Sequence, residues 1–192
     1  MQNFLNAYRT IKRFRDKTYS LMVARSFYEF GSRTVICVPF RIEGEGRIGV
    51  GSMVYIGANS WLQAIGPASV SNDPIITIGN GTSISGNCTI SGVSRISIGS
   101  NVLIAQSVYI GDHSHNYENV TIPIKHQGVA RVSPVQVCDG AWIGFGVVIL
   151  PGVRIGINAV VGANSTVKYD VPDHCTAVGS PAKIVRVRGA KG

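Results

Sequence analysis

Hydrophobic positions in the C-terminal half of the chain repeat every six residues. Aliphatic side chains occupy Val137, Ile143, Ile149, Ile155, Val161 and Val167, and small or β-branched ones follow at Ala141, Val147, Val153, Ala159 and Ser165. This period fits neither an α-helix, which repeats near 3.6 residues, nor a single strand, which repeats at two. It fits a short strand and a tight turn, repeated, which is typical of a parallel β-helix built from hexapeptides.

The same period extends back towards the N-terminus, less evenly. It begins near Val35 and shifts by two residues twice, once after Val54 and once after Ile96. Between these shifts, residues 66–74 are rich in Gly, Pro, Ser and Asn, which predicts a short excursion from the coil. We therefore predict that residues 35–170 form the β-helix and that 171–192 form a C-terminal extension along its outside.

One long interruption breaks the period, at residues 111–136. It contains His113, His115 and His126, three of the four histidines in the chain. A long loop that leaves a rigid repeat commonly carries functional side chains. We predict that this loop is extruded from the β-helix and holds the catalytic residues.

Residues 1–34 are predicted to form an N-terminal helical segment. Apolar residues recur there at steps of three and four, with basic residues between them. The apolar positions are Phe4, Tyr8, Ile11, Phe14 and Met22, and the basic ones are Arg9, Lys12, Arg13 and Lys17. Such a helix can pack its apolar side on the open end of the prism, or it can lie on a membrane surface. We favour the cap, which leaves the basic side free for peripheral contact with an anionic membrane.

Composition narrows the function classes. The formal charge is +8, but the excess of Lys and Arg lies mostly at the two ends of the chain. We find no apolar run long enough to span a membrane, no secretory signal and no nucleic-acid-binding motif, so we expect a cytoplasmic protein with no nucleic-acid partner. The four cysteines have no metal-binding spacing and are expected to be buried thiols.

Four motifs together resemble the hexapeptide-repeat acyltransferases, and most closely the bacterial sugar O-acetyltransferases. They are the repeat itself, VYIGDHSHNY at 108–117, DGAWIGFGVVILPGVRIG at 139–156 and VPDHCTAVGSPAKIVR at 171–186. The resemblance implies a left-handed parallel β-helix that assembles as a homotrimer, with active sites between subunits. It also implies acetyl-CoA as cosubstrate, a sugar or glycan as acceptor, and no metal.

The resemblance assigns catalysis to the histidines of the loop. In the family, one His takes the proton of the acceptor hydroxyl as that oxygen attacks the thioester, and it lies five residues after an aliphatic residue. His115 lies five residues after Ile110 and is therefore the predicted base. His113 is the alternative base, or it orients His115 or contacts the acceptor. An imidazole suits this role because its pKa lies near neutrality.

The resemblance also places the cofactor contacts. Trp142 matches an aromatic residue that lines the cofactor groove, and the Gly144 amide is a candidate donor to the oxyanion. Ala163 matches a small residue beside the pantetheine arm. Lys183 and Arg186 match basic positions near the cofactor phosphates, and Lys168 supplies a charge one position earlier than is usual in the family.

Acceptor contacts are expected at Ser85, Asn87 and Tyr117, by the same resemblance. Ser85 stands where galactoside enzymes have Asn, and Val93 stands where they have a sugar-binding Asp. The contacts to a free galactoside are therefore not reproduced. We expect the acceptor to be a sugar of a surface polysaccharide or its precursor, carried on a polymer, a lipid or a nucleotide.

The sequence thus predicts an acetyl-CoA-dependent O-acetyltransferase that transfers directly, with a His as general base. N-acetylation of a nucleotide-linked amino sugar and acetylation of a xenobiotic are the alternatives among enzymes. A non-catalytic scaffold and a metal-dependent enzyme resembling the gamma-type carbonic anhydrases are weaker alternatives.

Overall fold

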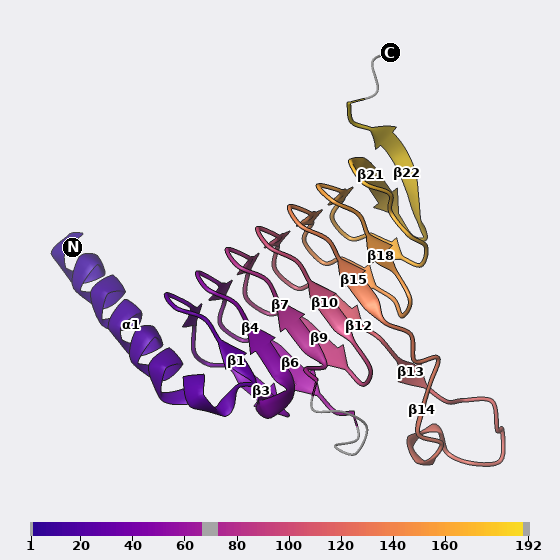
Figure 1. Ribbon diagram of the computed structural model, residues 1–192, viewed down its shortest axis with the longest axis horizontal. Helices are drawn as coiled ribbons and strands as arrows, with labels where there is room; N and C mark the ends of the chain where they lie inside the picture. The colour runs from indigo at the N-terminus through magenta and orange to yellow at the C-terminus, as the bar shows by residue number, and fades with distance from the viewer. Residues whose placement is uncertain (1, 67–72, 190–192) are drawn as a thin grey trace.

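Three parallel sheets form the three faces of a prism (Figure 1). The computed structural model describes residues 2–66 and 73–189, and it confirms a left-handed parallel β-helix that is mainly β. Face 1 has the order β1 (Glu29–Phe30), β4 (Ile48–Val50), β7 (Ile76–Ile78), β10 (Ile96–Ile98), β15 (Val135–Val137), β18 (Arg154–Ile155). Face 2 has the order β2 (Val35–Ile36), β5 (Tyr55–Ile56), β8 (Ser83–Ile84), β11 (Leu103–Ile104), β16 (Trp142–Ile143), β19 (Val160–Val161), β21 (Cys175–Gly179), β22 (Ala182–Val187). Face 3 has the order β20 (Thr166–Val167), β17 (Val148–Ile149), β12 (Tyr109–Gly111), β9 (Thr89–Gly92), β6 (Trp61–Ala64), β3 (Arg41–Glu43).

The predicted six-residue period is the core of this prism. Val137, Ile143 and Ile149 lie on faces 1, 2 and 3 in turn, and each is at most 1% exposed. Successive coils pair in parallel with aligned side chains, so that Ile143 pairs with Ile104 and Val161 on neighbouring coils. Small side chains fill the corners, where Ala141 and Ala159 are fully buried. The prediction of the core is confirmed.

The two-residue shifts in the period are a property of face 1. Its strands β4 and β10 each turn both of their end residues inwards, so that Ile48 and Val50 are buried in the first and Ile96 and Ile98 in the second. Because side chains alternate between the two sides of a strand, a strand that buries two residues is two residues longer than a strand that buries one. Most of the predicted excursion at residues 66–74 lies outside the described residues.

The loop after β12 leaves the prism, as predicted. It contains the antiparallel pair β13 (Ser114–His115) and β14 (Val129–Ala130) and the 3₁₀ helix η3 (Ile124–His126), and the chain re-enters the prism at β15. Figure 1 shows the loop projecting from the edge where face 3 meets face 1. Another 3₁₀ helix, η2 (Glu45–Arg47), precedes β4.

The N-terminal helix is shorter than predicted. Helix α1 spans Gln2–Val23, the 3₁₀ helix η1 follows at Ala24–Ser26, and β1 already pairs with β4 of the next coil. The prism therefore begins before Val35. Phe27 and Phe30 pack edge to face at 5.1 Å between ring centroids, and both belong to or pack against the core of the prism. The burial of these two aromatic rings therefore outweighs the helical periodicity of the residues that follow α1.

The orientation of α1 was predicted wrongly. Its polar side contacts the prism: the Ser20 hydroxyl accepts the Ile36 amide at 2.8 Å, and the Asp16 carboxylate accepts the Val38 amide at 3.3 Å. These amides belong to the first coil, which has no earlier coil to pair with on this face, and unpaired edge groups need partners. The unpaired amides at the edge of the sheet therefore hold the polar side of the helix against the prism. Of the helix residues, only Tyr19 and Val23 add apolar contact with the core.

The C-terminal extension also differs from its prediction. Val171 still bridges to Ile155 on face 1, and β21 continues face 2 in parallel with β19. Cys175 and Ala177 are buried, so the prism extends beyond residue 170. Strand β22 then pairs antiparallel with β21 and closes the end of face 2, rather than running along the outside of the prism.

All four cysteines are free and buried, as predicted. In the described ranges, no helix combines the length and hydropathy that crossing a membrane requires.

The attachment of α1 gives a prediction about stability. Burial alone would raise the pKa of Asp16, but hydrogen bonds from the Arg15 guanidinium and the Val38 amide outweigh it and hold the pKa below 3.8. We expect Asp16→Ala to lower the free energy of unfolding at neutral pH by about 1.5–3 kcal/mol, because it removes a buried charged acceptor. The contribution is present above pH 3.8 and is lost as the pH falls through the lowered pKa of the folded state.

Urea unfolding at neutral and acid pH measures this difference. Glu118→Ala is the control, since Glu118 is 76% exposed and its ion pair with Arg131 is long, at 3.7 Å. Equal stability of Asp16→Ala and the wild type at neutral pH would contradict the proposed anchoring of α1.

Candidate active site

A buried carboxylate fixes the base of the extruded loop. Asp112 follows β12 directly and is fully buried. Its Oδ1 accepts the amide of Val93 at 2.9 Å, and its Oδ2 accepts the amides of Ser94 at 2.7 Å and Arg95 at 2.8 Å. At the other end of the loop, the Ser133 amide donates to the Asp112 carbonyl at 2.8 Å. The loop is therefore tied to the rigid prism at both ends.

His113 is held by the same carboxylate. Its Nδ1 lies 3.0 Å from Asp112 Oδ1, and its side chain is only 9% exposed. A hydrogen bond from Nδ1–H to Asp112 leaves Nε2 as the free acceptor nitrogen. Tyr109 lies beside this pair: burial raises the pKa of its hydroxyl and the charge of Asp112 raises it further. The Tyr109 hydroxyl covers Gly111, where a Cβ would collide with it.

His115 has different surroundings from His113. It lies on β13 opposite Val129 of β14 and is exposed, and its imidazole makes neither a hydrogen bond nor an ion pair within the described part of the chain. An incoming hydroxyl can therefore reach His115 directly, whereas His113 is nearly buried. The third histidine of the loop, His126, is exposed at the end of η3.

Tyr117 lies just beyond the hairpin and remains 47% exposed. Its hydroxyl accepts a hydrogen bond from Arg131, which also lies 3.7 Å from Glu118. These contacts orient the Tyr117 ring on the same loop as His115. Among the residues that the structure describes, no three His, Cys, Asp or Glu side chains come close enough to hold a metal ion.

The cofactor candidates Trp142 and Arg186 share one cross-strand row on face 2. Trp142 pairs with Val160, Val160 with Thr176, and Thr176 with Arg186. Residues paired in register present their side chains to the same side of a sheet. The Trp142 indole is 50% exposed on this outer side. A flat ring and a cation thus lie on the same outer side of face 2, although they lie far apart in the sequence.

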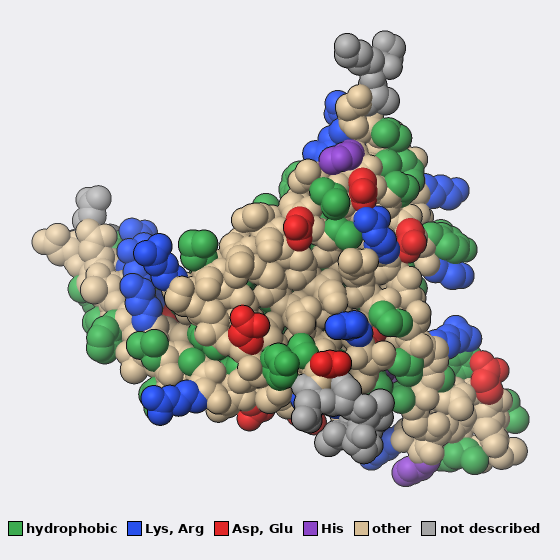
Figure 2. All heavy atoms as spheres, viewed as in Figure 1, with side chains coloured by type: hydrophobic (Ala, Val, Ile, Leu, Met, Phe, Trp, Pro, Cys, Tyr) green, Lys and Arg blue, Asp and Glu red, His purple; other side chains and the backbone are tan. Residues whose placement is uncertain are grey.

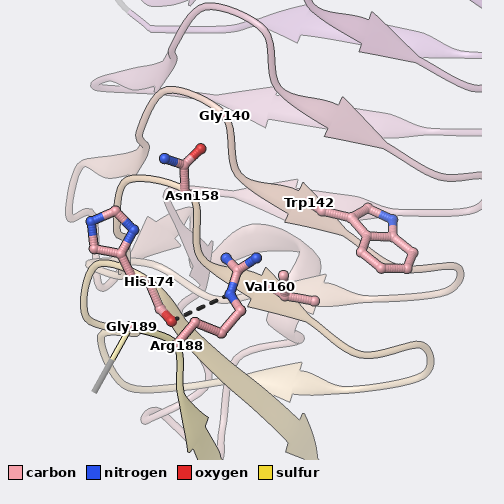
Figure 3. A pocket seen from close by; sticks show the side chains of 7 residues that line it. All are labelled: Gly140, Trp142, Asn158, Val160, His174, Arg188 and Gly189. Carbon is pink, nitrogen blue, oxygen red and sulfur yellow. Dashed lines mark hydrogen bonds between the residues drawn. The ribbon is translucent and has the colours of Figure 1, made fainter. Parts of the chain in front are cut away.

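A shallow cleft of about 480 Å³ lies beside Trp142 (Figure 3). Its lining residues are Gly140, Trp142, Asn158, Val160, His174, Arg188 and Gly189. The Arg188 side chain reaches into the cleft and its Nε lies 3.4 Å from the His174 carbonyl. The sequence analysis did not single out Arg188. The basic pattern Arg186–Arg188 at the end of the last strand is the signal that could have identified it.

Gly144 has a structural role that differs from its predicted one. Its amide donates to the Val161 carbonyl at 2.8 Å, so it is occupied by coil pairing and is not a free oxyanion donor. A Cβ at Gly144 would lie 2.7 Å from the Ala163 nitrogen. Gly144 therefore lets adjacent coils approach at the corner between faces 2 and 3. Ala163 lies exposed at the same corner, close to Gly144.

Lys168 and Lys183 lie on different parts of the prism. Lys168 is exposed at the corner between faces 3 and 1, with its Nζ 5.7 Å from the centre of the Tyr169 ring. Lys183 is exposed on β22, at the end of face 2. Only Lys183 therefore lies on the same sheet as Trp142.

The predicted acceptor residues also lie apart. Ser85 and Asn87 occupy the turn between β8 on face 2 and β9 on face 3, whereas Tyr117 belongs to the loop between faces 3 and 1. Asn87 has φ of +62°, a left-handed conformation that Asn adopts more readily than most residues. The backbone of the turn is therefore a sufficient reason for Asn at this position.

Within one chain, the predicted residues thus form two separate groups. The loop histidines lie at the edge between faces 3 and 1, whereas the cleft with Trp142 and Arg188 lies on face 2. A site that uses both groups needs a second copy of the chain.

Comparison with known proteins agrees with this architecture. The family model described as "bacterial transferase hexapeptide (six repeats)" matches residues 134–168. A probable acetyltransferase of Mycobacterium tuberculosis is 43% identical over 93 residues, which are 48% of this chain and 31% of that protein. The chain thus spans about a third of the length of that relative.

Two further relatives match over most of the chain. WbbJ of Escherichia coli, named for lipopolysaccharide-biosynthesis O-acetyl transfer, is 28% identical over 86% of this chain and 84% of its own length. A hexapeptide-repeat acetyltransferase of Vibrio cholerae, solved with acetyl-CoA, has a TM-score of 0.65 at 28% identity, over 90% of this chain and 78% of that one. Residues 134–168 thus carry the bacterial transferase hexapeptide repeat, and over most of its length the chain is similar to hexapeptide-repeat acetyltransferases.

The corner at Gly144 gives a prediction that separates a structural role from a cofactor contact. We expect Gly144→Ala to lower the free energy of unfolding by about 1–3 kcal/mol, because the added methyl overpacks a backbone contact. Chemical denaturation measures the change. The control is Gly46→Ala, where the nearest atom to a Cβ would be Ser26 O at 3.9 Å. If Gly144→Ala kept full stability and only weakened acetyl-CoA binding, the structural assignment would be wrong.

Proposed function

We propose that this protein is an acetyl-CoA-dependent O-acetyltransferase that acts on a sugar hydroxyl of a surface polysaccharide or its precursor. The observation that carries the proposal is the exposed imidazole of His115, on a loop that Asp112 and His113 fix to a rigid prism. The names of the relatives from E. coli and V. cholerae support acetyl transfer and acetyl-CoA, and the first supports a polysaccharide acceptor. Acetyl-CoA is a cytoplasmic metabolite, and we place the reaction there.

The proposed reaction is a direct transfer with His115 as general base. The acceptor hydroxyl oxygen attacks the thioester carbonyl carbon, and His115 takes the hydroxyl proton. The tetrahedral oxyanion then collapses, the C–S bond breaks, and the protonated His115 returns the proton to the leaving thiolate. The products are the O-acetyl sugar and free CoA thiol, so the enzyme ends the cycle unchanged.

His113 is proposed as a positioning residue for His115. It lies two residues before His115 on the same extended segment, and Asp112 holds its ring. Asp112 in turn is held by three backbone amides of the preceding coil. This chain of contacts fixes the start of β13 and therefore limits where His115 can lie. Positioning of a base to within fractions of an ångström is a large part of its effect.

The cofactor is proposed to lie against face 2. The exposed Trp142 indole offers a flat apolar surface, and Lys183, Arg186 and Arg188 offer charge-assisted hydrogen bonds to phosphates. Ala163, with its small side chain, leaves room at the corner between faces 2 and 3. Lys168 lies at another corner of the same chain, so it could meet this cofactor only from a neighbouring copy.

A homotrimer is proposed because one chain does not bring the loop and face 2 together. In a closed ring of three prisms, the loop edge of one copy can face the cleft of the next. Face 2 also exposes Tyr55, Leu103 and Trp142 along one cross-strand row, which a neighbour would cover. The same arrangement lets Ser85 and Asn87 of one copy approach Tyr117 of another around a single acceptor.

Release of CoA thiol, measured with acetyl-CoA against a panel of acceptors, tests the proposed reaction. The panel holds free, nucleotide-linked and lipid-linked sugars, together with nucleotide-linked amino sugars and small xenobiotics. We expect release that depends on a hydroxyl-bearing polysaccharide precursor. His115→Ala should lower turnover by about 10²–10⁴-fold without changing acetyl-CoA binding, since a positioned base contributes that much.

His126→Ala is the matched control, because it removes an exposed histidine of the same loop and should keep full turnover. Turnover with an amino sugar alone would replace O-transfer by N-transfer. Full activity of His115→Ala together with loss of activity in His113→Ala would move the base to His113. No binding of acetyl-CoA to the wild type would contradict the proposed function.

A further inference from the structure

Helix α1 has two unlike sides. The side towards the prism is polar: Asp16 and Ser20 are buried against the first coil, with exposures of 3% and 2%. Nearer the N-terminus, the same side lines a cleft of about 560 Å³ against Val35 and Tyr55 of the prism. The helix residues of this cleft are Arg9, Lys12, Arg13, Asp16 and Lys17.

The other side of α1 is apolar and exposed. Steps of three, four and seven residues place its large apolar side chains on one stripe of the helix. Phe4, Ile11, Phe14, Leu21 and Met22 are each 68–77% exposed. Figure 2 shows hydrophobic and basic side chains side by side along α1, which projects from the end of the prism in Figure 1. In the described part of the chain, no segment covers this stripe.

Basic residues flank the stripe. Lys12 lies four residues after Tyr8, and Lys17 lies three residues after Phe14, so both lie at its borders. The one carboxylate of the helix, Asp16, is engaged by Arg15 at 2.8 Å and by the Val38 amide. No ion pair or hydrogen bond holds the ammonium groups of Lys12 and Lys17 within the described residues.

Charge decides between the surfaces that could cover the stripe. A second copy of this chain carries the same net charge of +8 and the same basic helix, so it offers little to neutralise α1. A bilayer with anionic headgroups offers an apolar interior for the stripe and negative charge for its flanks. Long lysine side chains can extend from the helix to the headgroups while their carbon chains stay in contact with the acyl region.

We propose that α1 is an interfacial helix that attaches the protein to an anionic lipid bilayer through this apolar stripe. The helix lies parallel to the membrane plane with Phe4, Ile11, Phe14 and Met22 in the acyl boundary. Asp16 and Ser20 keep its C-terminal half fixed to the prism, so the prism stays at the surface. The attachment is independent of acetyl transfer and needs no acceptor.

Co-sedimentation with vesicles tests the proposal, using the full chain without acetyl-CoA. We expect binding to vesicles of phosphatidylglycerol mixed with phosphatidylcholine, and little binding to phosphatidylcholine alone. The double variant Ile11→Gln/Phe14→Gln should bind at least tenfold more weakly, because two large side chains leave the acyl region. Lys12→Gln and Lys17→Gln should each weaken binding roughly fivefold, and salt should weaken the wild type.

Asn6→Ala is the matched control, since Asn6 lies on the same side of α1 as Arg13, away from the stripe. It should bind as the wild type does, and circular dichroism should show all variants folded. Equal binding to both vesicle types, or unchanged binding of Ile11→Gln/Phe14→Gln, would overturn the proposal. So would a wild type that does not bind vesicles but loses oligomeric mass on Ile11→Gln/Phe14→Gln, because the stripe would then be a contact between copies.

Discussion

Hydrogen bonding between successive coils is the constraint on which this structure depends. Each short strand completes its backbone pairing only with the coil before and the coil after it, so the coils must stack at a fixed spacing. That spacing favours aliphatic side chains on the faces, one or two per strand, and small side chains at the corners. It also explains Gly144, whose amide pairs with Val161 and whose missing Cβ leaves room for Ala163.

The same constraint leaves unpaired backbone amides at the N-terminal end of the prism and beside the loop, and polar side chains bind them at both places. At the N-terminal end, Ser20 and Asp16 satisfy the amides of the first coil, which turns the apolar side of α1 away from the prism. At the loop, Asp112 satisfies the three successive amides of Val93, Ser94 and Arg95 and holds His113 at the same time. A single buried carboxylate thus links the backbone of the prism to the histidines of the loop.

The sequence predicted the core well because the period of six follows directly from burial. Each aliphatic residue of that period from Val137 to Val167 is buried. It predicted the loop for the same reason, since the period stops there. It did not predict the side of α1 that faces the prism, because hydrophobic periodicity reports an apolar stripe but not the unpaired amides that bind the polar side.

Asp112 was missed because a single Asp before a His forms no sequence pattern, and its hydrogen-bond partners lie on another coil. Arg188 reaches the cleft only through the antiparallel return of β22, and the sequence predicted a different course for this strand.

The separation of the two groups of site residues leads to the central claim, that the active site lies between copies of the chain. The variants His115→Ala and Trp142→Ala each lack one of the two groups, and we expect each to be inactive alone. Joint refolding of their mixture tests this claim most directly. In a ring of three, roughly a quarter of the interfaces formed at equal mixing pair an intact loop with an intact cleft, so we expect CoA release to return to about that fraction of the wild-type rate. If the mixture stays as inactive as either variant alone while trimers that contain both variants form, each chain must carry its own complete site, and the account would be contradicted.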